Sequence, residues 1–470
     1  MCIGTRAGRW VWVIVIAVLL VWGFTDVRRR AHLDPHDTTK HHTDLTVFTE
    51  AGAAFYDGRN PYTVTNPRGW YYLYPPLFAL LIAPLHVLPA SWQGVTWFLL
   101  SLLMAGGCLS ECRKIAQGIQ EAHSGKQPPD RRKFPGWIMI ATAAAVLFPF
   151  LDMLQRGQVG IAVLLPLLVG FRVISQARGR FSWFLGGAIL AFPVVMKVTP
   201  ALPVAILLLQ QFISAVRMER SPMAVRRFAH CLSGFMVGII FFLLLVPTIL
   251  IGWNDNFHHL RTWYTDVVAN ERLGETHNFN HHGVRNQSLN NAVYRLSNWL
   301  ANTTTVRPDD RDTGLPTAPP VQFPIDEAVV KTMLVVPQML LTLLLIVVAV
   351  RWHWESEGTV QVAVFGLACA MSLPLSPISW GHHFVILLPG MLFLPWALHE
   401  THRAAAGWLA IVAPALTLGH YITLQLAGAI AGKLGVLGIG IAIWCVVAGA
   451  YLLWMKPVHT PDIIASKAIA

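Results

Sequence analysis

The chain has 470 residues, of which 54% are hydrophobic and only 13% are charged. A water-soluble protein of this length would carry roughly twice that share of charged residues, so the composition excludes a soluble enzyme and indicates a membrane protein. The net charge of +11 belongs to short loops between apolar runs, and it therefore indicates membrane topology rather than nucleic-acid binding.

Long uncharged runs recur along the whole chain. Crossing a bilayer core of about 30 Å takes about 20 helical residues, and lipid offers no partner to an open backbone, so each run is predicted to be a helix. We expect an all-α polytopic membrane protein with about 12 transmembrane helices. The predicted spans cover residues 8–25, 91–110, 136–152, 158–174, 182–197, 199–214, 231–252, 330–350, 359–376, 383–398, 406–426 and 434–454.

Basic residues give the orientation of these spans. Three predicted loops that hold Arg113, Arg178 and Arg226 are rich in Lys and Arg, and such loops stay in the cytoplasm. Both termini are then cytoplasmic, and two large segments, 26–90 and 254–328, are extracytoplasmic loops of a single membrane domain spanning 1–470. The apolar stretch 77–89 in the first loop is too short to cross, so we expect it to lie in the membrane interface.

The first outer loop carries the most informative carboxylate. Asp44 follows the first span and is itself followed by Gly58-Arg-Asn-Pro-Tyr62 and by Tyr72-Leu-Tyr74-Pro-Pro76. An acidic group just outside a membrane helix, with an aromatic and proline-rich segment after it, favours chemistry on a lipid-borne substrate. The alternatives are a solvated surface group or a helix cap, and Asp34 and Asp37 are two other candidate carboxylates nearby.

Further polar residues collect at the outer ends of the spans, whereas the span centres carry almost no charge. Because ionisable groups in a membrane are costly and tend to be functional, this distribution predicts a cavity that opens outward. Lys197 could also be a snorkelling anchor, and Tyr74 could belong to an interfacial aromatic belt. The polar motifs are Asp152, Arg156-Gly157-Gln158, Lys197-Val-Thr-Pro200, Asn286-Gln287-Ser288 and Ser376-Pro-Ile-Ser379-Trp380-Gly-His382-His383.

In this order, the motifs resemble those of glycosyltransferase family 87, polytopic enzymes related to the α-mannosyltransferases of phosphatidylinositol-mannoside synthesis. The resemblance runs from about Asp44 to about Pro389, and its most distinctive pieces are 44–76 and 376–383. It implies an architecture similar to the GT-C transferases and a polyprenyl-phosphate sugar, typically mannose, as the donor on the extracytoplasmic side. Under this resemblance Asp44 matches the catalytic carboxylate of the family.

The chemistry of such a transfer assigns roles to the other residues. A base must take the proton of the acceptor hydroxyl, and the departing phosphate needs cations or hydrogen-bond donors rather than an acid. Asp44 is the predicted general base of an inverting transfer. The predicted substrate-binding residues are His382, His383, Lys197 and Arg156 for the phosphate, Gln158, Asn286 and Gln287 for sugar hydroxyls, Tyr74 and Trp380 for stacking, and Tyr62.

We expect no metal and no cofactor, because no Cys or His spacing resembles a metal site and His258-His259 and His281-His282 lack a completing carboxylate or Cys. The expected partners are the lipid-linked donor, a glycolipid or glycan acceptor and membrane lipids, with no nucleic acid. The expected location is a bacterial inner membrane, with the site facing outside. Two alternatives stay open: a transporter or flippase of lipid-linked sugars, and a transferase of the same fold acting on protein or on a lipid A-type acceptor.

Overall fold

The structure, a computed structural model, describes residues 6–34, 36–124, 134–176, 179–217, 221–269, 286–289, 291–293, 327–354, 358–376, 378–399, 401–426 and 435–456. Within these ranges the regular structure is helical, and the only β-type pairings are two isolated bridges, Thr65 with Tyr71 and Asn286 with Trp380. The predicted all-α class is confirmed.

The helices follow the predicted order of spans and loops. The N-terminal half contains α1 (Arg6–Arg30), η1 (Thr38–Lys40), α2 (Leu45–Tyr56), α3 (Pro76–Ile82), η2 (Ala83–Val87), α4 (Ala90–Ser124), α5 (Gly136–Arg156), α6 (Gly160–Gln176), α7 (Arg180–Met196), α8 (Ala201–Arg217) and α9 (Pro222–Ile240). The remainder contains η3 (Phe241–Leu245), α10 (Val246–Ile251), α11 (Trp253–Trp263), η4 (Tyr264–Ala269), α14 (Glu327–Arg351), α15 (Gly358–Leu375), η5 (Gly381–Ile386), α16 (Leu387–Leu398), α17 (Arg403–Leu426) and α19 (Val436–Trp454).

Each predicted span coincides with a described helix. Among the described residues, eight helical segments are long and apolar enough to cross a membrane, while α6, α7 and α8 are apolar but shorter. The chain is therefore an integral membrane protein, and the count of about 12 spans stays a prediction.

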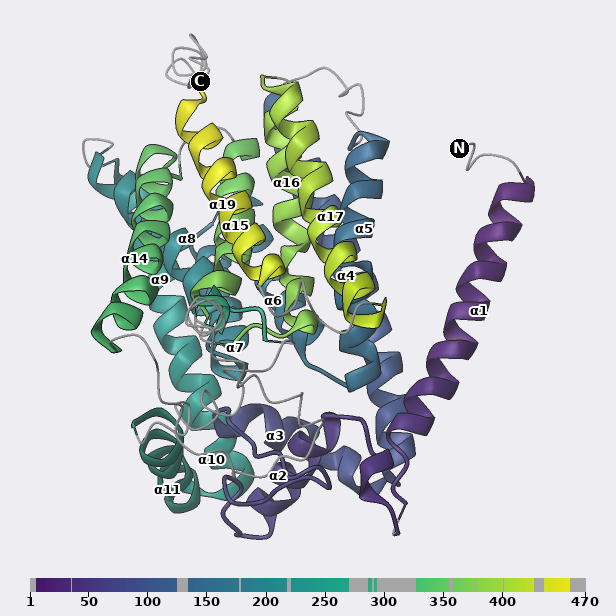
Figure 1. Ribbon diagram of the computed structural model, residues 1–470. Helices are drawn as coiled ribbons and strands as arrows, with labels where there is room; N and C mark the ends of the chain where they lie inside the picture. Colours follow the sequence, from purple (N-terminus) through teal and green to yellow (C-terminus); the bar gives the residue numbers. More distant parts are fainter. Residues whose placement is uncertain are drawn as a thin grey trace.

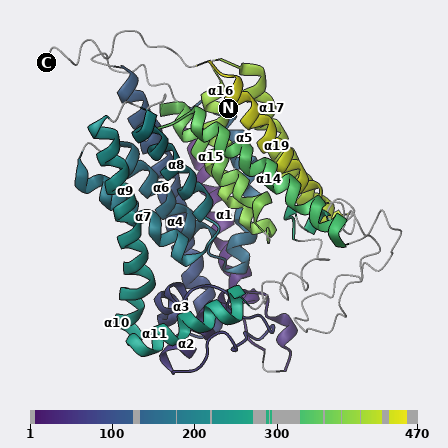
Figure 2. The same cartoon turned by 90° about the vertical axis from the view of Figure 1, so that its left-hand side faces the viewer.

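The helices form an elongated bundle with a smaller layer at one end (Figure 1). That layer consists of α2, α3, α10 and α11, and we call this end of the molecule the loop end (Figures 1 and 2). At the opposite end α1 begins and α19 ends, as expected if both termini lie on one side of the membrane.

The centre of the bundle is formed by α15 and α16. Every residue of α15 from Val362 to Pro374 is buried, as expected for a helix that is apolar on all sides. Around this centre the neighbouring helices approach closely through small residues. On α7, a Cβ at Gly187 would lie 2.1 Å from the carbonyl oxygen of Cys231 on α9, so these two helices pack backbone to backbone.

The two outer loops differ in part from their predicted outlines. Helix α1 continues through Arg30, so the predicted loop start at residue 26 lies inside a helix, where Asp26 pairs with Arg29 and Arg30. The stretch 77–89 falls largely within α3 and η2, and α3 lies at the loop end (Figure 1). Its interfacial position stays a prediction. The second loop begins with helical turns through Ala269. The His281-His282 pair, which the sequence analysis does not interpret as a metal site, lies outside the described residues.

Candidate active site

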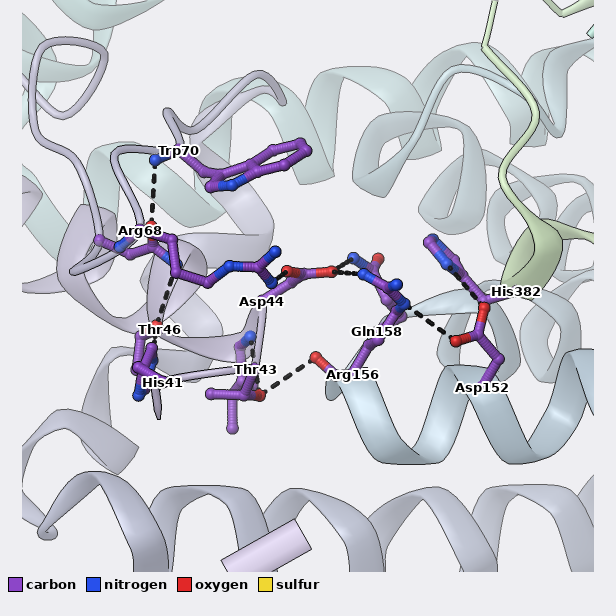
Figure 3. Close-up of polar contacts among 12 residues, drawn as sticks. His41, Thr43, Asp44, Thr46, Arg68, Trp70, Asp152, Arg156, Gln158 and His382 are labelled. Carbon is purple, nitrogen blue, oxygen red and sulfur yellow. Dashed lines mark hydrogen bonds and ion pairs between the residues drawn. The ribbon is translucent and has the colours of Figure 1, made fainter. Parts of the chain in front are cut away.

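Asp44 lies immediately before α2 at the loop end, in the position of a helix cap. Its side chain makes no capping hydrogen bond to α2, although an Asp in this position usually makes one. Instead, Oδ1 accepts a hydrogen bond from Arg68 Nη1 at 2.9 Å, and Oδ2 accepts one from Gln158 Nε2 at 2.9 Å (Figure 3). The carboxylate therefore faces a polar cluster, and the interpretation of Asp44 as a simple cap is wrong.

The junction between α5 and α6 holds the backbone at Asp44. The carbonyl oxygen of Arg156 accepts hydrogen bonds from the Asp44 N–H at 2.8 Å and from Thr43 Oγ1 at 3.1 Å. The next residue, Gly157, ends α5 with a positive φ of 66°, and a Cβ there would lie 2.8 Å from Leu45 Cβ. Glycine is thus required twice in the Arg-Gly-Gln motif, for its backbone conformation and for the close approach of the Asp44 segment.

Arg156 connects Asp44 to a second carboxylate. Its Nη1 lies 3.6 Å from Asp44 Oδ2, and its Nε donates to Asp152 Oδ1 at 2.9 Å. Asp152 Oδ2 in turn lies 3.6 Å from His382 Nδ1 and 3.5 Å from the hydroxyl of Tyr421. A row of alternating charges therefore runs from the start of α2 through the end of α5 to η5 (Figure 3).

Lys197 and His383 form a second polar pair. Lys197 directly follows α7, and its Nζ is hydrogen-bonded to His383 Nε2 at 2.9 Å. The ammonium also lies 5.6 Å from the centre of the Tyr74 ring, within the range of a cation–π contact. Burial lowers the pKa of Lys197 to about 8, because a charged amine is disfavoured away from water. Burial, with a further effect of the Asp44 charge, raises the pKa of Tyr74 to about 12, so this phenol stays neutral.

Arg68 is a member of the cluster that the sequence analysis missed. Its side chain is only 4% exposed, and its guanidinium lies 5.5 Å from the centre of the Trp70 ring. Asn66 fixes this turn because its Oδ1 accepts the backbone N–H groups of both Arg68 and Trp70 at 3.0 Å. The signal that could have identified Arg68 is its position between Asn66 and Trp70 in the aromatic loop that follows Asp44.

The amide motif of the second outer loop is bound to the motif before α16. Asn286 Oδ1 accepts the N–H groups of Ser379 at 3.0 Å and Ser288 at 3.1 Å, and the Gln287 N–H donates to the carbonyl oxygen of Ser379 at 2.7 Å. These contacts position Trp380, whose ring lies 5.8 Å from that of Trp70. Asn286 thus anchors the neighbouring motif, and its predicted contact with sugar hydroxyls stays a prediction.

Some of the candidates lie outside the cluster. Tyr62 is fully buried, donates to the carbonyl oxygen of Tyr74 at 3.2 Å and packs against Phe55. It supports the loop from within the aromatic core. Asp34 and Asp37 pair with Lys40 and do not join Asp44, which leaves Asp44 as the carboxylate of the cluster that comes from the first outer loop.

Charged groups of both signs meet in the cluster. Among the described residues these are two carboxylates, Asp44 and Asp152, and three cations, Arg68, Arg156 and Lys197. Within the described ranges no group of three or more His, Cys, Asp or Glu side chains is placed to hold a metal ion.

Comparison with known proteins identifies related sequences. The sequence model of glycosyltransferase family 87 matches residues 72–377. A curated protein of Mycolicibacterium smegmatis (strain ATCC 700084 / mc(2)155), the polyprenol-phosphate-mannose-dependent alpha-(1-2)-phosphatidylinositol mannoside mannosyltransferase, is 24% identical over 388 residues, which cover 80% of this chain and 74% of that protein. No solved structure matches the chain significantly. The matched family region contains Arg156 and Lys197, whereas Asp44 and Arg68 precede it and His382 follows it.

Proposed function

Since the chain belongs to glycosyltransferase family 87 and is an integral membrane glycosyltransferase, we propose that it moves mannose from a polyprenyl-phosphate donor to a glycolipid or glycan acceptor. The reaction takes place at the loop end, which lies on the extracytoplasmic side of a bacterial inner membrane. The observation that supports this proposal best is the buried Asp44 carboxylate, set among Arg68, Arg156 and Lys197 at one end of a membrane bundle. The relative's named donor, polyprenol-phosphate-mannose, makes mannose the first sugar to test.

In the proposed reaction Asp44 is the general base. The acceptor hydroxyl attacks the anomeric carbon of the donor sugar while its proton passes to Asp44. The bond from the anomeric carbon to the phosphate oxygen breaks, and its electron pair leaves with the phosphate. A carboxylate offers about four acceptor positions, and Arg68 and Gln158 each use one, so Asp44 can also accept the hydroxyl proton. A single displacement of this kind inverts the anomeric configuration.

The residues of the cluster other than Asp44 are suited to bind the phosphate of the donor. The phosphodiester carries one negative charge, which suits a site that contains several cations. Lys197, Arg156, His382 and His383 are the groups proposed to meet it. Lys197 and His382 are buried, and fixed donors act strongly where water is excluded. Trp70 and Trp380 lie together and offer apolar rings to the sugar or to the prenyl chain.

The depressed pKa of Lys197 predicts a pH dependence of donor binding. Below about pH 8 the amine is protonated and can bind the phosphate, whereas above it the charge is lost. The dissociation constant for polyprenyl-phosphate mannose should therefore rise above that value and level off about tenfold higher once the amine is neutral. Binding measured by scintillation proximity between pH 6.5 and 9.5 tests this.

Lys197→Arg is the matched control, because a guanidinium stays charged throughout this range. It should remove the dependence, and Lys197→Met should weaken binding at pH 7 by about tenfold. A Lys197→Met protein that binds the donor as tightly as the wild type, with the same pH dependence, would contradict the assignment of Lys197 to the phosphate.

The direct test of function is transfer of label. Purified protein in lipid nanodiscs is given radiolabelled polyprenyl-phosphate mannose and a total lipid extract of the host, with polyprenyl-phosphate glucose and a nucleotide-linked mannose as alternative donors. We expect label in a new glycolipid with the first donor alone. The acceptor that becomes labelled decides between a glycolipid, a protein and a lipid A-type molecule. The transporter alternative has less support, because transporters bind substrate near the bilayer midplane, whereas this cluster joins the start of α2, a helix of the loop end, to the end of α5.

A further inference from the structure

Asp152 is a carboxylate inside a membrane helix that the mechanism above does not use. It lies four residues before the last residue of α5, with its side chain 23% exposed. A charged group in such a segment is costly and is kept when it has a partner and a task. Its two oxygens contact different groups: Oδ1 accepts from Arg156 Nε at 2.9 Å, and Oδ2 faces His382 Nδ1 at 3.6 Å.

The His382 ring is positioned for this carboxylate. It is 4% exposed, and among the described residues no group comes within hydrogen-bond distance of its Nδ1. Asp152 Oδ2 is just beyond that distance, and catalytic hydrogen bonds are often long in the unliganded state and tighten when substrate binds. Gly381 lets η5 come this close, since a Cβ there would lie 2.4 Å from the Tyr421 hydroxyl and 3.4 Å from Asp152 Oδ2.

We propose that Asp152 is a positioning residue of the transfer reaction, aligning His382 through Nδ1 and holding Arg156 beside Asp44. With Nδ1–H bound to the carboxylate, the ring is fixed and its protonated form is stabilised, so that Nε2–H can donate to the departing phosphate. This inference rests on the proposed function, because it assigns Asp152 to the same reaction.

The charges balance in this arrangement. The acceptor proton neutralises Asp44 at the moment when the phosphate receives the electron pair of the broken bond and gains a second negative charge. Arg156 then loses an anionic partner and can turn its charge toward the phosphate together with His382. The charged and titratable groups around His382 are Asp152 and Arg156 from α5, Lys197 after α7, His383 in η5 and Tyr421 in α17.

A second buried carboxylate provides a matched control. Glu111 in α4 is also buried and pairs with an arginine, Arg172 on α6, and with Lys114. It lies toward the opposite end of the bundle, and no histidine takes part in these two ion pairs. Glu111→Gln removes the same kind of charge from the same kind of environment, so it reports the general cost of losing an intramembrane ion pair.

The test compares Asp152→Asn with Glu111→Gln in nanodiscs, using polyprenyl-phosphate mannose as donor. Asparagine keeps the shape and can still bind Arg156, but it lacks the negative charge that stabilises the protonated form of His382. For Asp152→Asn we expect kcat to fall by about 100-fold while donor binding stays within about threefold of wild type. For Glu111→Gln we expect both kcat and donor binding to stay within about threefold of wild type. Asp152 and His382 are proposed to act as a unit. The double variant Asp152→Asn/His382→Gln should therefore be no slower than the slower of the two single variants.

Rescue by a conservative variant separates positioning from a structural role. Asp152→Glu should recover part of the rate even if the asparagine variant folds poorly. An Asp152→Asn protein that transfers within about threefold of wild type, or losses that multiply in the double variant, would overturn the inference. Absence of transfer by the wild-type protein would instead overturn the proposed function, and this inference with it.

Discussion

Replacing Asp44 with asparagine is expected to lower the rate of sugar transfer by at least about 1000-fold while donor binding stays within a few-fold of wild type. Asparagine has the same shape and can still accept a hydrogen bond from Arg68 or Gln158, so the local fold is retained. It cannot take the proton of the acceptor hydroxyl, and no other described carboxylate from the first outer loop lies in the cluster. The measurement is initial-rate transfer of label in nanodiscs, with donor binding determined on the same preparation.

Asp34→Asn is the control for this experiment. Asp34 comes from the same loop and also pairs with a cation, Lys40, but this pair lies apart from Asp44. Its replacement should leave transfer within about twofold of wild type, because exposed ion pairs contribute little. A well-expressed Asp44→Asn protein with full activity would remove Asp44 from the role of base.

The second large effect is expected at Gly157. Gly157→Ala places a side chain in the left-handed backbone region at φ 66° and brings its Cβ to 2.8 Å from Leu45 and 2.9 Å from the Thr43 hydroxyl. Holding an alanine in the left-handed backbone conformation costs about 1–2 kcal/mol of folding free energy. The contacts add to this cost by pushing away the two residues on either side of Asp44. We expect a lower unfolding temperature and a loss of transfer of at least about tenfold, because small displacements of a catalytic group reduce rates strongly.

Gly58 separates these two contributions. Its φ of 67° is nearly identical, but an added Cβ would meet nothing within 4 Å. Gly58→Ala should therefore show the backbone cost alone, with transfer close to wild type. Equal losses of transfer in the two variants would show that the close approach of Gly157 to the Asp44 segment is unimportant for catalysis.

The sequence predicted the helices well because apolar runs of membrane length leave the backbone no other structure. It also placed Asp44, Arg156, Gln158, Lys197 and the paired histidines at helix ends on one side of the membrane, and the structure brings these ends together. Polar residues at the ends of spans are easily recognised in a sequence that is otherwise apolar. The position of a motif relative to the bilayer was therefore predictable from its place in the chain.

Pairings between distant segments were not predictable in the same way. Arg68 contacts Asp44 only because its loop folds back, and Asp152 faces His382 across a long separation in sequence. The sequence pattern also cannot say whether a polar side chain binds a ligand or its own neighbour. Asn286 illustrates this, since its amide oxygen accepts a hydrogen bond from the backbone N–H of Ser379.

Roles within the cluster likewise depend on which atoms are already engaged. Gln158 was predicted to contact the sugar, but its amide donates to Asp44 and so orients the proposed base. Tyr62 was grouped with the substrate-binding residues because it belongs to a motif, and it proved to be part of the aromatic core. Tyr62 therefore supports the site by packing, whereas the contact of Gln158 with sugar hydroxyls stays a prediction. The spacing of residues in the sequence does not distinguish these two roles.

The most direct test of the central claim is the stoichiometry of transfer by the wild-type protein. Purified protein in nanodiscs is incubated with doubly labelled polyprenyl-phosphate mannose and host lipids, and both products are quantified. A transferase that uses this donor should release one polyprenyl phosphate for each mannose that appears in the acceptor. If all the label remains on intact polyprenyl-phosphate mannose while the protein binds it, transfer from this donor is refuted.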